Sequence, residues 1–194
     1  MREEGRAPAD NRPQESGGRR FPSSARRVAL VAICAAIIEV GKLALSGLPN
    51  VEVVTLLCAL FGYCFGGWGV LSAVVFAFVE IPIYGVHTWV ISYFLYWPLV
   101  SLVFFGFRRI GLRNRWLFTG AAVLLTVWFG VLTSLVDVGL FTGFYDRFFY
   151  RFGIYYMRGI WFYVVQIACN AVVFPTLFLF LESKISPFRK LFLT

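Results

Sequence analysis

Carboxylates, phenols and one imidazole recur in this sequence at spacings that place them on a shared helix face. Glu80, Tyr84 and His87 follow one another at intervals of four and three residues, the repeat of an α-helical face. An acid and an imidazole at this spacing could transfer protons, or they could hold a small molecule with the help of nearby rings. No HExxH, GxSxG or paired-carboxylate pattern accompanies them, and the chain has no GxxxxGK[ST] phosphate loop. These residues therefore favour a binding site over a catalytic one.

Similar side chains recur in other hydrophobic parts of the chain. Glu52 precedes Thr55 by three residues, and Trp89 precedes Tyr93 by four. A later stripe of small and hydroxyl-bearing residues ends in an acidic residue: Thr126, Gly130, Thr133 and Asp137. The last hydrophobic segment carries one phenol and two amides, in Tyr163, Gln166 and Asn170. The candidate substrate-binding residues are Glu52, Glu80, Tyr84, His87, Trp89, Tyr93, Asp137, Arg158, Tyr163 and Gln166.

The chain that must position these residues is 59% hydrophobic and only 14% charged, with a mean hydropathy of +0.76. This composition excludes an ordinary soluble domain. The apolar residues form blocks long enough to cross about 30 Å of hydrocarbon as helices. They are continuous rather than alternating, which excludes a β-barrel pattern. We predict an all-α integral membrane protein with six transmembrane helices, at about 28–47, 51–66, 68–86, 88–107, 116–137 and 159–182.

The basic residues predict the orientation of these helices. Of the 18 Lys and Arg residues, fourteen precede the first block, lie in 108–115 or follow the sixth. The positive-inside rule then places both termini in the cytoplasm of a multi-pass cell-membrane protein, so the net charge of +8 needs no nucleic-acid partner. Residues 1–24 are rich in Arg, Glu, Pro, Gly and Ser, which predicts a disordered cytoplasmic tail before a membrane domain at 25–194.

In this orientation the candidate binding residues gather towards the outer ends of five helices. We therefore expect a polar pocket with aromatic walls that opens to the outside, although Trp and Tyr also form interfacial belts on membrane proteins in general. Glu52 is expected in the first turn of a helix capped by Asn50, where the helix dipole tolerates a carboxylate. Glu39 and Lys42 are expected to pair within one helix. The segment 138–158 is expected to form an outer loop or interfacial helix over the site.

Alanines line the cytoplasmic half of the first predicted helix. Ala25, Ala29, Ala32 and Ala36 follow at intervals of four, three and four residues, which forms one small-residue stripe. In lipid, such stripes allow helices to pack closely. The stripe predicts a contact either with another helix of this chain or with a partner protein.

Three segments together resemble the substrate-binding S components of energy-coupling factor (ECF) transporters. They are "ARRVALVAICAAI", with the alanine spacing of the family's first helix, "LPNVEVVTLLCALFGYCFGGWG" and "FVEIPIYGVHTWVISYFLYWP". The resemblance covers about residues 25–190. It implies six helices, capture of a vitamin or related micronutrient from outside, and docking of the alanine stripe on a transmembrane coupling protein that works with two ATPase subunits.

The resemblance favours a larger cofactor such as cobalamin as the ligand, with flavin-like, thiamine-like and queuosine-related molecules as alternatives. The chain itself is then not an enzyme and needs no cofactor or metal. Its four cysteines form no CxxC pair and are expected to be small buried apolar residues. Two other functions stay open: a structural scaffold protein of the cell envelope, which the alanine stripe alone would suit, and an intramembrane enzyme that uses Glu52, Glu80 and His87.

Overall fold

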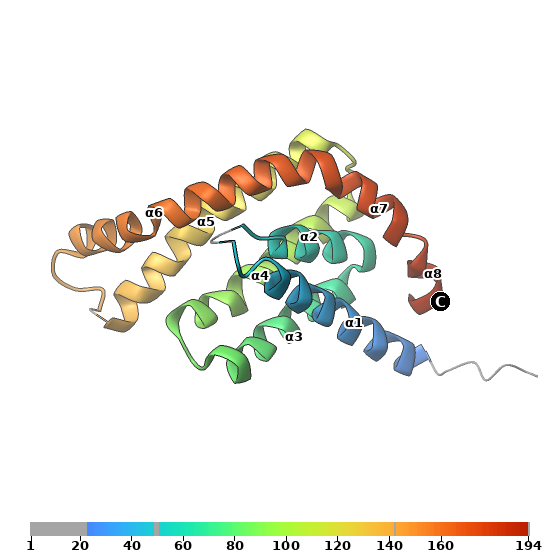
Figure 1. Cartoon of the computed structure of the whole chain (residues 1–194), viewed down its shortest axis with the longest axis horizontal. Helices are drawn as coiled ribbons and strands as arrows, with labels where there is room; N and C mark the ends of the chain where they lie inside the picture. The colour runs from blue at the N-terminus through green and yellow to red at the C-terminus, as the bar shows by residue number, and fades with distance from the viewer. Residues whose placement is uncertain (1–22, 49–50, 142, 194) are drawn as a thin grey trace, which may run out of the picture.

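The computed structural model of this chain describes residues 23–48, 51–141 and 143–193, and every regular element in them is a helix (Figure 1). In chain order, the helices are α1 (Ser23–Ala44), α2 (Val54–Phe65), α3 (Gly67–Tyr84), α4 (Thr88–Arg109), α5 (Arg115–Phe141), α6 (Phe148–Val173), the π-helical turn η1 (Phe174–Phe178), α7 (Leu179–Ile185) and α8 (Phe188–Leu193). The prediction of an all-α protein is confirmed for the described residues.

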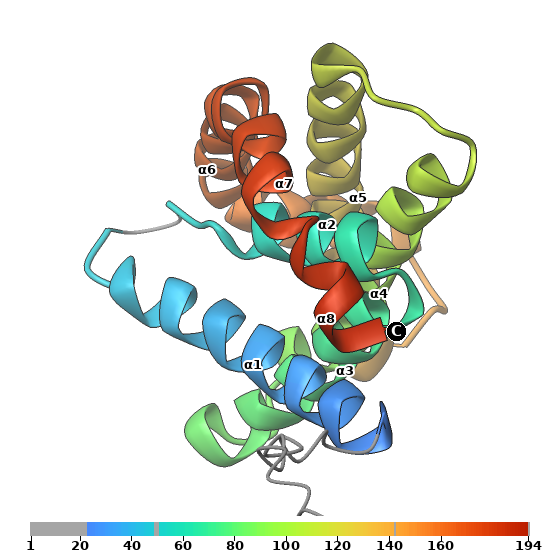
Figure 2. The same cartoon turned by 90° about the vertical axis from the view of Figure 1, so that its right-hand side faces the viewer.

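The helices are stacked in three layers. Figures 1 and 2 show α5 and α6 side by side on one face, α1 and α3 on the opposite face, and α2 and α4 between them. The middle helix α2 is buried along its whole length except at Leu57. Because apolar neighbours surround it, α2 reads as continuously hydrophobic rather than amphipathic.

Small residues allow α2 to lie against its neighbours at backbone distance. A Cβ atom on Gly62 would lie 2.1 Å from the carbonyl oxygen of Ser101 on α4, and one on Gly69 of α3 would lie 2.1 Å from the carbonyl oxygen of Phe61. The hydroxyl of Ser101 donates to the carbonyl of Cys58 at 2.6 Å. These contacts fix α3 and α4 against α2 and thereby position the side chains that they carry.

Four helical stretches are long and apolar enough to cross a membrane: Gly67–Tyr84, Thr88–Arg109, Arg115–Phe141 and the continuous stretch Phe148–Ile185. In α1, Arg26, Arg27, Glu39 and Lys42 interrupt the apolar sequence. The second helix, α2, has only 12 residues.

Three helix starts differ from the sequence prediction. The first helix begins at Ser23 rather than at residue 28. The second begins at Val54 rather than at residue 51, so the expected position of Glu52 in its first turn is wrong, while Asn50, its expected cap, lies outside the described residues. The last long helix begins at Phe148 rather than at residue 159, because 148–158, expected to be an outer loop or an interfacial helix, is helical and continuous with it.

The predicted tail at 1–24 falls outside the described residues except for its last two. Ser23 and Ser24 are helical and begin α1, so the boundary of the helical domain lies before residue 25.

Candidate small-molecule site

The ammonium group of Lys42 lies at the centre of the polar and aromatic cluster. Its Nζ forms an ion pair with the carboxylate of Glu80, whose side chain is fully buried. The same Nζ lies 4.1 Å from the ring centroid of Tyr84, 5.2 Å from that of Trp89 and 5.5 Å from that of Tyr93. Phe76 provides a fourth ring at 6.0 Å. We call these four rings the aromatic box.

Three helices position this cluster. Lys42 is in the last turn of α1, where a cation also interacts favourably with the helix dipole. Phe76, Glu80 and Tyr84 follow one another at intervals of four residues on α3, which packs along α1. Trp89 and Tyr93 are one turn apart on α4. The expected pair between Glu39 and Lys42 is wrong, because Lys42 bonds across to α3 rather than along its own helix.

Glu39 is the second buried carboxylate beside this cluster. Only 8% of the residue is exposed, and neither of its carboxylate oxygens has a hydrogen-bond partner among the described residues. Its carboxyl group lies close enough to that of Glu80 for the two to interact electrostatically, and to hydrogen-bond to each other when one of them is protonated. The Oε1 atom of Glu80 is also buried. When both groups are ionised, the cluster therefore contains three buried acceptor atoms for which the described chain supplies no donor.

The rings continue from the aromatic box into the interior along α4. The imidazole of His87 stacks on Trp89, with 5.9 Å between ring centroids, and Trp89 meets Tyr93 edge to face at 5.1 Å. Tyr93 in turn contacts Trp97, with 5.2 Å between ring centroids, and the ring of Phe129 on α5 contacts both Tyr93 and Trp97. Edge-to-face and offset contacts of this kind hold the rings in fixed orientations.

Glu52 lies in the loop before α2 rather than within the helix. Its carboxylate accepts a hydrogen bond from Thr55 at 2.8 Å, and its main-chain carbonyl accepts one from the Cys169 thiol at 3.3 Å. Glu52 lies close enough to Lys42 for the two groups to interact electrostatically, although no ion pair between them is present in the described residues.

The remaining predicted residues lie on α5 and α6 and do not join the box. The hydroxyl of Tyr163 lies 3.0 Å from that of Thr133, so this pair ties α6 to α5. Asp137 and Gln166 are half-buried. Arg158 is exposed and lines an open hollow on the N-terminal part of α6 with Phe149, Tyr150 and Met157. The structure therefore brings Glu80, Tyr84, His87, Trp89 and Tyr93 together, with Glu52 nearby.

Sequence reasoning missed Lys42, Glu39 and Phe76 as members of the cluster. A signal for the first two was present, because both lie near the outer end of the first predicted helix, at the expected depth of Glu80. Charged side chains at that depth need partners of opposite charge, and the partner of a side chain on one helix often lies on another helix.

The alanine stripe lies on the surface of α1. Ala25, Ala29, Ala32 and Ala36 are all exposed, although α8 lies beside the first two, where Leu191 and Phe192 line a hollow together with Ala25 and Ala29. Beside the stripe, an apolar groove of about 370 Å³ runs between α1, α2 and the C-terminal helices, and Ile33, Phe65 and Phe188 contribute to its walls.

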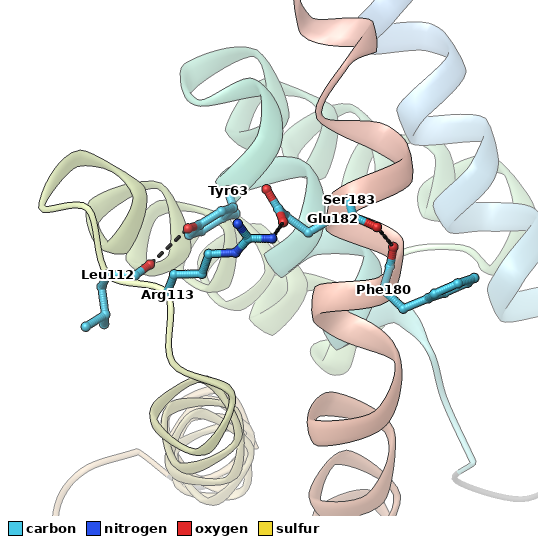
Figure 3. Close-up of polar contacts among 6 residues, drawn as sticks. All are labelled: Tyr63, Leu112, Arg113, Phe180, Glu182 and Ser183. Atoms are coloured by element: carbon cyan, nitrogen blue, oxygen red, sulfur yellow. Dashed lines mark hydrogen bonds and ion pairs between the residues drawn. The ribbon is translucent and has the colours of Figure 1, made fainter.

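Polar contacts at the end of α2 opposite Glu52 join the C-terminal helices to the α4–α5 loop (Figure 3). Arg113 of this loop donates to Glu182 of α7 at 2.9 Å, and the hydroxyl of Tyr63 donates to the carbonyl of Leu112, also at 2.9 Å. Ser183 donates to the carbonyl of Phe180 within the C-terminal helical stretch. The guanidinium of Arg108 lies 5.4 Å from the Tyr63 ring centroid. These contacts fix the interhelical loop against the C-terminal helices.

Within the described residues, no group of three or more His, Cys, Asp or Glu side chains could hold a metal ion. Comparisons of the chain with protein-family models, with curated proteins and with solved structures give no match.

Proposed function

We propose that this protein is the substrate-binding S component of an ECF-type importer, which captures a vitamin or related micronutrient outside the cell and docks on a coupling protein with two ATPase subunits. In this proposal α1, α2, α3, α4, α5 and the continuous stretch α6–α7 are six membrane-crossing segments. Both termini are cytoplasmic. The protein itself performs no catalysis.

The observation that carries the proposal is the difference between the two ends of α1. At its C-terminal end, Lys42 lies among four rings and the buried carboxylate of Glu80. Along its N-terminal half, the helix presents alanines at its surface. Aromatic rings and charged groups held in fixed positions suit the binding of a small molecule. A helix face of small residues suits close packing of a partner helix in lipid.

The experiment tests whether the alanine stripe is a docking face. The tagged chain is purified from detergent-solubilised membranes of its own host, and copurifying proteins are identified by mass spectrometry and assayed for ATP hydrolysis. We expect a multi-pass partner and ATPase subunits with P-loop sequences. Ala32→Trp should abolish their recovery because an indole prevents close helix packing.

Val40→Trp is the matched control, since Val40 is another exposed residue of α1 but lies one turn beyond the stripe, nearer to Lys42 and to the opposite end of the helix. It should retain the partners, and both variants should elute as monodisperse protein. Recovery of no ATPase with the wild-type chain, or equal recovery with Ala32→Trp, would contradict the proposal. An envelope scaffold would instead recover structural partners without ATPase subunits.

A further inference from the structure

The carboxylates around Lys42 exceed the positive charge that the chain supplies there. When both carboxyl groups are ionised, Glu80 uses one oxygen to bind Lys42, while its other oxygen and both oxygens of Glu39 are buried without donors among the described residues. A buried acceptor without a donor is costly, and a buried uncompensated carboxylate is more so. The site therefore offers acceptors that a single ammonium group does not satisfy.

The aromatic box selects for positive charge rather than for an apolar ligand. The faces of aromatic rings attract cations, and this attraction strengthens when the cation is removed from water. The ammonium of Lys42 already occupies this position within 6.0 Å of four ring centroids.

Lys42 is the more accessible partner of the ion pair. Its side chain is 21% exposed, whereas that of Glu80 is fully buried. Its stem has four rotatable methylene groups. Displacement of Lys42 would free the centre of the aromatic box and leave Glu80 in place to receive another cation.

We propose that the site binds a flat, protonated amino-heteroaromatic molecule, which displaces the Lys42 ammonium from the aromatic box and donates N–H hydrogen bonds to Glu80 and Glu39. This inference rests on the proposed function and specifies its substrate class. A box that closes around one ammonium group suits a molecule with one or two fused rings better than a corrin such as cobalamin.

The test compares two probes of similar shape and different charge. At neutral pH, 4-aminoquinoline is a flat cation with ring and exocyclic N–H donors, whereas 4-methylquinoline is neutral. Binding to the full chain in phosphatidylcholine nanodiscs is measured by equilibrium dialysis, with empty nanodiscs as the correction for uptake into lipid. We expect 4-aminoquinoline to bind at least about tenfold more tightly, the discrimination that a charged, buried hydrogen bond provides.

Two substitutions in the site should act in opposite directions. Glu39→Gln keeps the shape but removes a carboxylate, so it should weaken 4-aminoquinoline binding by about tenfold or more. Lys42→Gln should strengthen binding, because it removes the competing ammonium while its amide can still bond Glu80. Glu182→Gln is the acidic control at the opposite end of the molecule and should have no effect.

Equal binding of the two probes, or unchanged binding in Glu39→Gln, would overturn the inference. Weaker binding in a folded Lys42→Gln would overturn displacement, and if that variant does not fold, Glu39→Gln decides. Recovery of ATPase subunits by a protein that binds neither probe preferentially would refute the cationic substrate alone. Cation binding without ATPase recovery would instead refute the importer proposal.

Discussion

At the scale of single residues, Gly62 shows how closely the helices of this protein approach one another. The carbonyl of Ser101 occupies the space into which any side chain at position 62 would project. The obstructing atoms belong to the backbone of α4, which cannot rotate away as the end of a side chain can. The position therefore requires glycine for packing, since its backbone is ordinary helix.

Gly62→Ala should lower thermal stability, because the added methyl group forces α2 and α4 apart. Overpacking of this kind costs about 1–3 kcal/mol. Thermal unfolding in detergent, followed by circular dichroism, measures the change. Gly120→Ala on α5 is the matched control: a Cβ there meets no atom within 4 Å, so stability should be unchanged or slightly higher. Equal melting temperatures for the two variants would contradict the packing argument.

At the scale of helices, one ion pair links the α4–α5 loop to α7. The two partners differ in environment, because the side chain of Glu182 is 8% exposed and that of Arg113 is 61% exposed. Removal of the arginine leaves a nearly buried carboxylate without its partner, whereas removal of the carboxylate leaves an arginine that water can solvate. The two single substitutions therefore should not have equal effects.

Arg113→Ala should destabilise the protein more than Glu182→Ala, and the double variant should resemble Glu182→Ala. The contribution of the pair itself is modest, about 1 kcal/mol, because the arginine is exposed. Chemical denaturation of the four proteins gives the coupling energy. Additive effects of the two substitutions would show that the ion pair contributes nothing.

Sequence patterns predicted the helices better than their ends. The third, fourth and fifth predicted helices begin within a residue of the observed α3, α4 and α5, because their apolar runs are bounded by Gly, Thr and Arg. The starts of α2 and α6 were missed for opposite reasons. An apolar run does not reveal that 51–53 is non-helical, and the aromatic composition of 148–158 suits an outer loop as well as an interfacial helix, of which the structure shows a helix.

The site was only partly predictable because helix periodicity describes one helix at a time. The spacing of Glu80 and Tyr84 identified one face of α3 correctly, whereas His87 lies beyond the end of α3 as the N-cap of α4 and joins the cluster by stacking on Trp89. The partner of Lys42 was mispredicted, since a carboxylate three residues away suggests a pair within the helix. Packing of α1 on α3 brings a second carboxylate closer, and a single sequence gives no information on that packing.

At the scale of the whole molecule, the proposed function requires that the two ends of α4 lie on opposite sides of the membrane. His87 caps the N-terminal end beside the aromatic box, and Arg109 ends the helix among the basic residues of 108–115. Both positions are exposed.

In a cysteine-free background, His87→Cys should react with a membrane-impermeant maleimide added to intact cells, and Arg109→Cys should react only after the cells are permeabilised. Gel-shift of the labelled protein measures the reaction. Each variant is the control for the other, because both cysteines lie at exposed ends of the same helix. The reverse labelling pattern would place the aromatic box in the cytoplasm and refute capture from outside.

The shortness of α2 has a consequence for water. Its 12 residues extend about 18 Å, whereas the hydrocarbon of a bilayer is about 30 Å thick. In the proposed function α2 crosses the membrane, and residues 51–53 then lie below the headgroups as non-helical backbone, which lipid tails cannot solvate. The protein supplies partners for some of these peptide groups, including the carbonyl of Glu52. Water over Glu52 would supply the others, and it would give a dissolved molecule a wet path towards the rings.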